Sequence, residues 1–493
     1  MDEFDRMLYQ DARQMPPDVI NQEPPKPWEI SVKRISWGLI LINITLNFYG
    51  LNIILPAVGT VLLWLGLRSL RRTNGGFRFA CCCATVYAVL HMAAIVLQAT
   101  PFDLAVSERI GGEWSTGTGT LPFYYALRTV VLQLTLTLTV TGLWRGLKAM
   151  FLDAGQIPRT AAAGGLVILE ALMIPLAFIG VNGWLLVGPL LILFLFLIWS
   201  LYKLGKSLNE AGYTLTPAPV RFPCGLAFGL WLGIPLAAVM TLPILFSRLP
   251  VPEQTPVCGS DENTALRAEL LRLGFPEDLL SKLSDSELAK FQGAYGLTMK
   301  VKGQEDSSGS YPDGIPSVEM LEIPVRDDHY DFHTVYLAYL CWSAEEVSGG
   351  GYMEGIRVIP DWQGVTVHTS CPSGTLEWRD ESGMFHTAPM SFYFRSDGSG
   401  VPSYYADFSL PKGVEGPVEG WVSWESAPAY PEKLTVYNYQ LAFAHRLTPW
   451  QYPYRLPSDV LLSGKGSPGW RVNYERGYTG QLAPEGQFVS GGY

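Results

Sequence analysis

The segment Arg-Asp-Asp-His-Tyr-Asp-Phe-His groups residues that could bind a metal ion. Residues two apart in a β-strand face the same way, so His329, Asp331 and His333 would lie on one face. Two imidazoles and a carboxylate suit zinc or a similar divalent metal, and His368 or His386 would supply a fourth ligand. A polar surface loop that leads into a buried strand is the alternative explanation for the same residues.

Glu170 interrupts an otherwise apolar stretch, Gly-Gly-Leu-Val-Ile-Leu-Glu-Ala-Leu-Met. A charged side chain at the centre of a bilayer costs about 2.5 kcal/mol or more on insertion scales. We therefore expect Glu170 to be protonated or to face a partner such as His91 or Arg128. A carboxylate in this place would relay protons or cations in a transporter or transporter subunit. The alternative is a hydrogen bond between packed helices, or a position nearer the membrane interface.

Aromatic residues are abundant after residue 250, with seven Trp and 17 Tyr. Exposed rings bind sugar faces and peptides, whereas buried rings build β-sandwich cores. Trp421 and Trp424 are three apart in one predicted strand, so they point to opposite faces and we expect that they are not both core. They are therefore candidates for an aromatic face that binds a cell-wall polymer or a peptide.

The known motifs of catalysis are missing from the chain. It has no Gly-x-x-x-x-Gly-Lys-Ser/Thr, Gly-x-Ser-x-Gly or His-Glu-x-x-His sequence, which argues against a nucleotide-driven motor, a serine hydrolase elbow or a zincin helix. No Cys-x-x-Cys pair occurs, and Cys341–Cys371 is the one disulfide we consider within the second half. We expect no catalytic residues and no cofactor beyond a possible divalent metal.

The two halves of the chain differ in charge and hydropathy. Residues 1–250 hold 18 Lys and Arg against 13 Asp and Glu, a net charge of +5, whereas residues 251–493 hold 17 against 32, a net charge of −15. The acidic half argues against nucleic acid, because a phosphate backbone needs a basic face. The contrast predicts two different solvents, a lipid bilayer for the first half and water for the second.

A bilayer core needs about 20 apolar residues per helix, and lipid leaves such a segment no other fold. Residues 35–249 are expected to form a transmembrane bundle of six to seven segments. The apolar runs are 35–67, 79–97, 123–144, 164–179, 184–202 and 224–246.

The first apolar run has two interpretations. It is either a single span or a tight helical hairpin that turns at Tyr49–Gly50–Leu51–Asn52. Asn43, Asn47 and Asn52 share roughly one helical face, which favours a position against protein over a position in lipid.

Basic residues predict how the chain is oriented in the membrane. They cluster in the loops after the first, third and fifth runs, and the alternate loops carry almost none. Residues 1–34 are therefore expected to be a polar cytoplasmic segment, with the first run acting as an uncleaved signal anchor. The chain would be a multi-pass plasma-membrane protein whose residues from about 250 onward are extracytoplasmic.

The second half begins with a linker at 250–260. Residues 261–300 predict a three-helix unit, in which Ser284-Asp-Ser-Glu287 is a capping box that starts the third helix. From 311 to 493 the apolar period changes to two, and nine short strands between 317 and 445 predict an antiparallel β-sandwich. The tail from 446 is expected to be irregular.

Two segments resemble a known group of proteins. Asn-Phe-Tyr-Gly-Leu-Asn-Ile-Ile-Leu-Pro-Ala-Val-Gly-Thr-Val-Leu-Leu (47–63) and Leu-Gly-Phe-Pro-Glu-Asp-Leu-Leu-Ser-Lys-Leu-Ser-Asp-Ser-Glu-Leu (273–288) resemble sequences of uncharacterised polytopic membrane proteins from Gram-positive anaerobic bacteria. Ala57 and Thr60 replace the Asp and Tyr of that pattern, and Gly59 comes one residue early. The resemblance implies a bacterial plasma membrane and carries no chemistry.

These observations favour a non-enzymatic membrane protein of the bacterial cell envelope. Its extracytoplasmic domain would bind a ligand or partner, such as a cell-wall polymer or another membrane protein. A transporter that uses Glu170 and a metal-dependent enzyme that uses the His329 segment are the alternatives.

Overall fold

The computed structural model divides into two compact units, residues 1–98 with 102–239 and residues 99–101 with 240–493. The structure describes residues 27–45, 51–110, 113–116, 119–153, 155–179, 184–210, 222–250, 263–302, 316–326, 333–343, 352–360, 367–395, 402–412, 414–428, 437–463, 470–479, 481–482 and 488–489.

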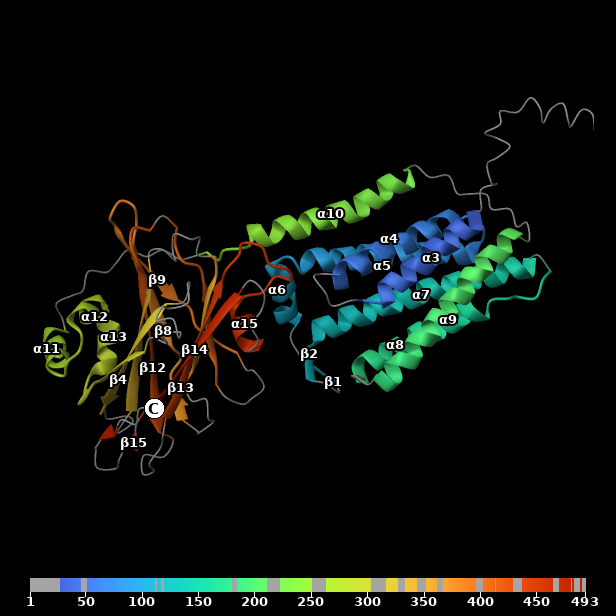
Figure 1. The fold of residues 1–493 in the computed structure, drawn as a ribbon. Helices are drawn as coiled ribbons and strands as arrows, with labels where there is room; N and C mark the ends of the chain where they lie inside the picture. The colour runs from blue at the N-terminus through green and yellow to red at the C-terminus, as the bar shows by residue number, and fades with distance from the viewer. Residues whose placement is uncertain are drawn as a thin grey trace, which may run out of the picture. The chain divides into compact units, whose positions relative to one another are not determined.

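The first unit is a helix bundle (Figure 1). α3 packs against α4 and α9, α5 against α4 and α7, and α8 against α7 and α9, which closes a ring of six helices. α6 and the short hairpin β1–β2 lie between α5 and α7 in the chain. The bounds are α3 Pro27–Asn43, α4 Leu51–Leu70, α5 Gly75–Leu97, α6 Pro101–Ile110, β1 Glu113–Thr116, β2 Gly119–Pro122, α7 Phe123–Asp153, α8 Ala161–Ile179, α9 Trp184–Glu210 and α10 Cys224–Leu245.

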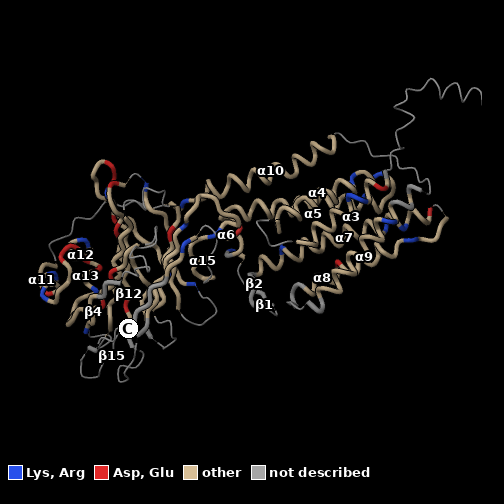
Figure 2. The backbone as a smooth tube through the Cα atoms, viewed as in Figure 1, with Lys and Arg blue, Asp and Glu red and all other residues tan. Residues whose placement is uncertain are grey.

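Among the described residues, five helices are long and apolar enough to cross a membrane. They lie in α4, α5, α7, α9 and α10, and the apolar part of α8 is shorter. All six predicted apolar runs are helical, the first of them except at residues 44–45 and at residues 46–50, which lie outside the described chain, and several helices extend well beyond the runs, as α7 does to Asp153. Lys and Arg gather at the end of the bundle where α4 and α9 finish (Figure 2).

The first apolar run forms two helices, α3 and α4, as the hairpin interpretation predicts. α3 starts at Pro27, so the last residues of the predicted polar segment 1–34 are already helical. The two helices meet at glycines: a Cβ on Gly59 would lie 2.7 Å from the carbonyl oxygen of Gly38, and a Cβ on Gly66 would lie 2.8 Å from that of Ser31. Small residues let helix backbones approach closely, which is how helices associate in lipid.

The second unit is a β-sandwich of two antiparallel sheets (Figure 1). One sheet has the order β3-β4-β5-β12-β8-β9, with β7 also paired to β12, and the other has the order β10-β11-β6-β13-β14. The bounds are β3 Thr298–Lys302, β4 Ser317–Val325, β5 His333–Trp342, β6 Glu354–Ile359, β7 Val367–Thr369, β8 Ser373–Arg379, β9 Phe385–Met390, β10 Tyr393–Phe394, β11 Tyr404–Phe408, β12 Val418–Pro428, β13 Tyr437–Arg446 and β14 Trp470–Thr479. The nine predicted strands are therefore confirmed as β4 to β9 and β11 to β13.

A layer of short helices covers the outer face of the seven-stranded sheet. It comprises α11 Thr264–Arg272, α12 Glu277–Lys282, α13 Asp285–Leu288 and the 3₁₀ turn η2 Ala289–Phe291. Leu280, Leu288 and Phe291 share one buried cluster with Leu321 and Leu337 of the sheet. The helices of the predicted three-helix unit are therefore part of the sandwich unit, because their apolar faces are buried on the strands.

The tail after residue 446 is more regular than predicted. Tyr437–Arg446 pairs along its whole length with β14, and α15 Pro457–Ser463 lies on β6 and β13. Gly355 of β6 allows this approach, because a Cβ there would lie 2.3 Å from the Pro457 side chain. The Pro, Tyr and Gly content suggested an irregular segment, but the exposed edge of β13 supplies a template for one more strand.

The Gly38–Gly59 contact can be tested by substitution. Changing Gly59 to Ala places a methyl group against backbone, so α3 and α4 must separate and the bundle loses about 1–3 kcal/mol. We expect a lower melting temperature for the full chain in detergent. The matched control is Gly229→Ala in α10, where nothing lies within 4 Å of the new Cβ and Ala favours the helix by about 1 kcal/mol. Equal melting temperatures for the two variants would contradict the contact.

Candidate functional site

Glu170 of α8 joins three helices of the bundle. Its carboxylate is almost fully buried, at 1% exposure. Nδ2 of Asn43 in α3 donates to Oε1 at 3.0 Å, and Nε2 of Gln133 in α7 donates to Oε2 at 2.7 Å. The same nitrogens also donate to the backbone carbonyls of Leu39 and of Glu170 itself. These second bonds fix both amides with their N–H groups toward the carboxylate.

A pocket of about 290 Å³ opens beside this carboxylate. Asn43 and Glu170 are its two polar residues, and the rest of its wall is aliphatic or aromatic. The lining residues come from the end of α3, from α8 and from α9, and they include Leu169, Met173, Leu190 and Phe194. An apolar pocket with a few convergent polar groups is the usual form of a small-ligand site.

The partners expected for Glu170 are placed elsewhere. His91 is half-buried and stacks on Tyr87, with ring centroids 5.7 Å apart. Arg128 pairs with Asp103 of α6 at 3.3 Å. Two neutral amides contact Glu170 instead of these two residues, which agrees with the alternative of a hydrogen bond between packed helices.

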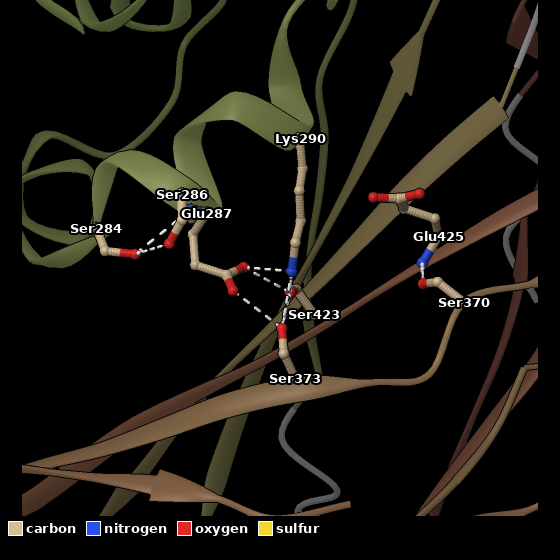
Figure 3. A network of polar contacts seen from close by, with 8 residues as sticks. All are labelled: Ser284, Ser286, Glu287, Lys290, Ser370, Ser373, Ser423 and Glu425. Carbon is tan, nitrogen blue, oxygen red and sulfur yellow. Dashed lines mark hydrogen bonds and ion pairs between the residues drawn. The ribbon is translucent and has the colours of Figure 1, made fainter. Parts of the chain in front are cut away.

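A second polar cluster ties the helical layer to the seven-stranded sheet (Figure 3). Nζ of Lys290 lies 2.7 Å from Oε2 of Glu287, and it donates to the hydroxyls of Ser373 in β8 at 2.7 Å and Ser423 in β12 at 3.0 Å. Both serines in turn donate to Glu287, at 3.0 and 2.8 Å. Lys290 is therefore held in an ion pair and donates to both serines, which suits binding and positioning.

The local sequence explains how Glu287 reaches the sheet. Ser284 is the N-cap of α13, and its hydroxyl accepts from the Glu287 amide, as the capping box predicts. The full motif also requires the Glu287 side chain to accept from the Ser284 amide, and it does not do so here. It instead pairs with Lys290 one turn later and with the strand serines.

Lys282 makes a second tie between this helical layer and the same sheet. It pairs with Glu419 of β12 and donates to the Tyr339 hydroxyl at 3.4 Å. Burial, and then the neighbouring Glu419 carboxylate, raise the pKa of Tyr339 above its usual range. Burial also raises the pKa of Glu377, while Lys282 acts in the opposite direction.

A polar pocket of about 750 Å³ lies beside the Lys290 cluster. Lys290, Arg326, His333 and Glu425 bring charged or ionisable groups to its wall, together with Ser286 and Gln292. Glu425 is two residues after Ser423 in β12 and therefore lies on the same face of the sheet. In Figure 3 its carboxylate has no partner, and the described residues include no hydrogen bond or ion pair to it.

The predicted metal site is only partly within the described chain. His329 and Asp331 lie outside the described residues, and His333 is buried at the start of β5. Of the alternative ligands, His386 pairs with Asp380 at 2.8 Å and stacks on Trp378. The described residues bring no three His, Cys, Asp or Glu side chains together as metal ligands.

Trp421 and Trp424 do point to opposite faces of β12. Both are nonetheless buried, Trp421 under the helical layer and Trp424 between the two sheets. The inference that one of them must be exposed was wrong, because both faces of this sheet are covered. Cys341 and Cys371 are both free thiols.

No protein-family model matches the chain, and comparison with curated proteins also found no match.

The sequence reasoning missed Gln133 and the Lys290 cluster. Gln133 is an amide inside an apolar run, a weaker signal of the same kind as Glu170. The pair Glu287 and Lys290 has the i, i+3 spacing of helical ion pairs. Ser373 and Ser423 carried no signal, because only the pairing of β8 with β12 places them opposite each other.

The Lys290 cluster predicts strong coupling between Glu287 and Lys290. Changing Glu287 to Gln or Lys290 to Met leaves buried polar groups short of a partner, so each should cost about 1–3 kcal/mol. The double variant should cost less than the sum, because both changes break the same contacts. The measurement is the urea midpoint of the β-sheet circular dichroism signal of the full chain. Lys412→Met, a control at an exposed site, should leave the urea midpoint unchanged. If the cost of the double variant equals the sum of the two single costs, the network is contradicted.

Proposed function

We propose that this protein is a multi-pass plasma-membrane protein of the bacterial cell envelope whose C-terminal domain lies outside the cytoplasm and binds a ligand or partner without catalysing a reaction. The observation that carries this proposal is the polar pocket at Lys290, Arg326, His333 and Glu425, built on a rigid sheet. The five apolar helices of the other unit supply the anchor.

The placement of basic residues supports this sidedness. Arg71 and Arg72 follow α4, Arg145 and Lys148 lie in the last turns of α7, and Lys203 lies near the end of α9. We infer that α3 and the shorter α8, which pack against the long helices, cross together with the five candidate spans, so that the basic ends share one side and α10 ends on the other. Loops rich in Lys and Arg stay in the cytoplasm, so the sandwich would be outside.

The pocket suits a polar ligand that carries both signs of charge. Arg326 supplies donors for a carboxylate, Lys290 adds positive charge to the wall, and the unpartnered Glu425 carboxylate accepts from an amine or amide. The stem peptides of a cell-wall polymer offer both kinds of group. The rings of Trp421 and Trp424 are buried and take no part in this proposal.

The sidedness can be tested with a reporter fused after Tyr493. We expect alkaline phosphatase, which folds only outside the cytoplasm, to be active at this position in intact cells. The same enzyme fused after Asn74, in the basic loop between α4 and α5, is the matched control and should be inactive. Activity after Asn74 and none after Tyr493 would invert the topology and remove the proposal.

Ligand binding can be tested by co-sedimentation of the full chain in detergent with purified peptidoglycan. We expect Glu425→Gln and Arg326→Ala each to weaken binding at least about fivefold, which corresponds to about 1 kcal/mol. Glu381→Gln removes an exposed carboxylate elsewhere on the same domain and should bind like the wild type. If the wild type stays in solution, or if all variants sediment alike, the cell wall is not the ligand of this pocket.

A further inference from the structure

The pocket at Glu170 combines a buried carboxyl group with an apolar cavity inside the helix bundle. Its volume of about 290 Å³ is near the lower end of ligand pockets, which run from about 300 to 1,000 Å³. The carboxylate lies on the wall of this cavity, and Leu169, Leu190 and Phe194 surround it. The cavity therefore fits a small molecule with one polar end and an aliphatic body.

Glu170 has no basic partner in the part of the chain that the structure describes. Its carboxylate oxygens accept hydrogen bonds from Asn43 and Gln133, both neutral amides. Each amide is also bound to a backbone carbonyl, so it cannot turn to offer an acceptor. A carboxylate oxygen accepts more than one hydrogen bond, and a ligand in the cavity would supply both the missing donors and the missing positive charge.

The rim of the cavity faces the outside of the bundle. Met173 is 41% exposed, Val187 43% and Leu191 40%, and all three line the cavity. In a membrane this surface meets acyl chains, because α8 and α9 are apolar around these residues. An amphiphilic ligand can therefore enter the cavity laterally from the bilayer, without passing through water.

We propose that the Glu170 pocket is a binding site for a small amphiphilic amine, whose ammonium group pairs with the carboxylate while its aliphatic chain fills the cavity between α3, α8 and α9. The pairing replaces part of the hydration that a carboxylate loses in hydrocarbon. This proposed site is independent of the outer domain and of the ligand that the outer domain binds.

The probe is n-octylammonium, compared with n-octanol, which has the same chain and no charge. Binding is measured as the concentration dependence of the melting temperature of the full-length protein in nonionic detergent at neutral pH. We expect octylammonium to stabilise the wild type at concentrations at least tenfold lower than octanol. Glu170→Gln keeps the size of the side chain and removes the charge, so it should abolish this tenfold preference. Asp153→Asn, at an exposed carboxylate of the same bundle, should keep it.

A second variant guards against the chance that Glu170→Gln fails to fold. Leu190→Trp leaves Glu170 in place and fills the cavity, so it should raise the octylammonium concentration required at least tenfold. The proposal is overturned if octanol and octylammonium stabilise the wild type equally, or if Leu190→Trp binds the amine as the wild type does. It is also overturned if a folded Glu170→Gln variant retains the preference for the amine.

Discussion

Five described helices of the bundle are apolar enough to cross a membrane, and hydrocarbon offers no hydrogen-bond partner to the polar groups that such helices carry. α7 shows this constraint most clearly: the hydroxyls of Thr129, Thr135, Thr137, Thr139 and Thr141 each donate to the carbonyl oxygen four residues earlier. A helix rich in β-branched, polar residues can thus cross an apolar phase without an unsatisfied hydroxyl. Gln133 of the same helix has too long a side chain for this local solution and reaches across to Glu170.

The sandwich solves a different problem, because its seven-stranded sheet is buried on both faces. Strand β12 shows the consequence: Trp421 packs under the helices, Trp424 packs between the sheets, and Ser423 and Glu419 receive lysines from the helical layer. Polar residues on a covered strand need partners from the covering element. Two lysines placed eight residues apart, Lys282 and Lys290, therefore fix the helices on the sheet at separate points.

Periodicity and segment length predicted the elements well, but they could not predict tertiary partners. The strands from 317 to 446 were found because alternation and turn residues are local signals, and the hairpin α3–α4 was one of two interpretations that the Gly50 region allowed. Glu170 stood out because a charge in an apolar run is rare. Its partners Asn43 and Gln133 are 127 and 37 residues away, so only the packing of the helices reveals them. The burial of Trp421 likewise depends on helices encoded more than 130 residues earlier in the chain.

Glu170 and Glu287 are two buried carboxylates with opposite solutions, and the difference bears on what each does. Glu287 pairs with Lys290 and accepts from two serines, so its charge is balanced within the domain. Its role there is to hold the helical layer on the sheet. Glu170 receives hydrogen bonds only from amides, which satisfy an acceptor at each of its two oxygens and carry no positive charge. Helix packing therefore accounts for the two acceptors at this position and supplies no group that balances a charge. A carboxylate whose charge no described residue balances is better explained by ligand binding than by helix packing. The apolar cavity beside Glu170 has room for the body of such a ligand.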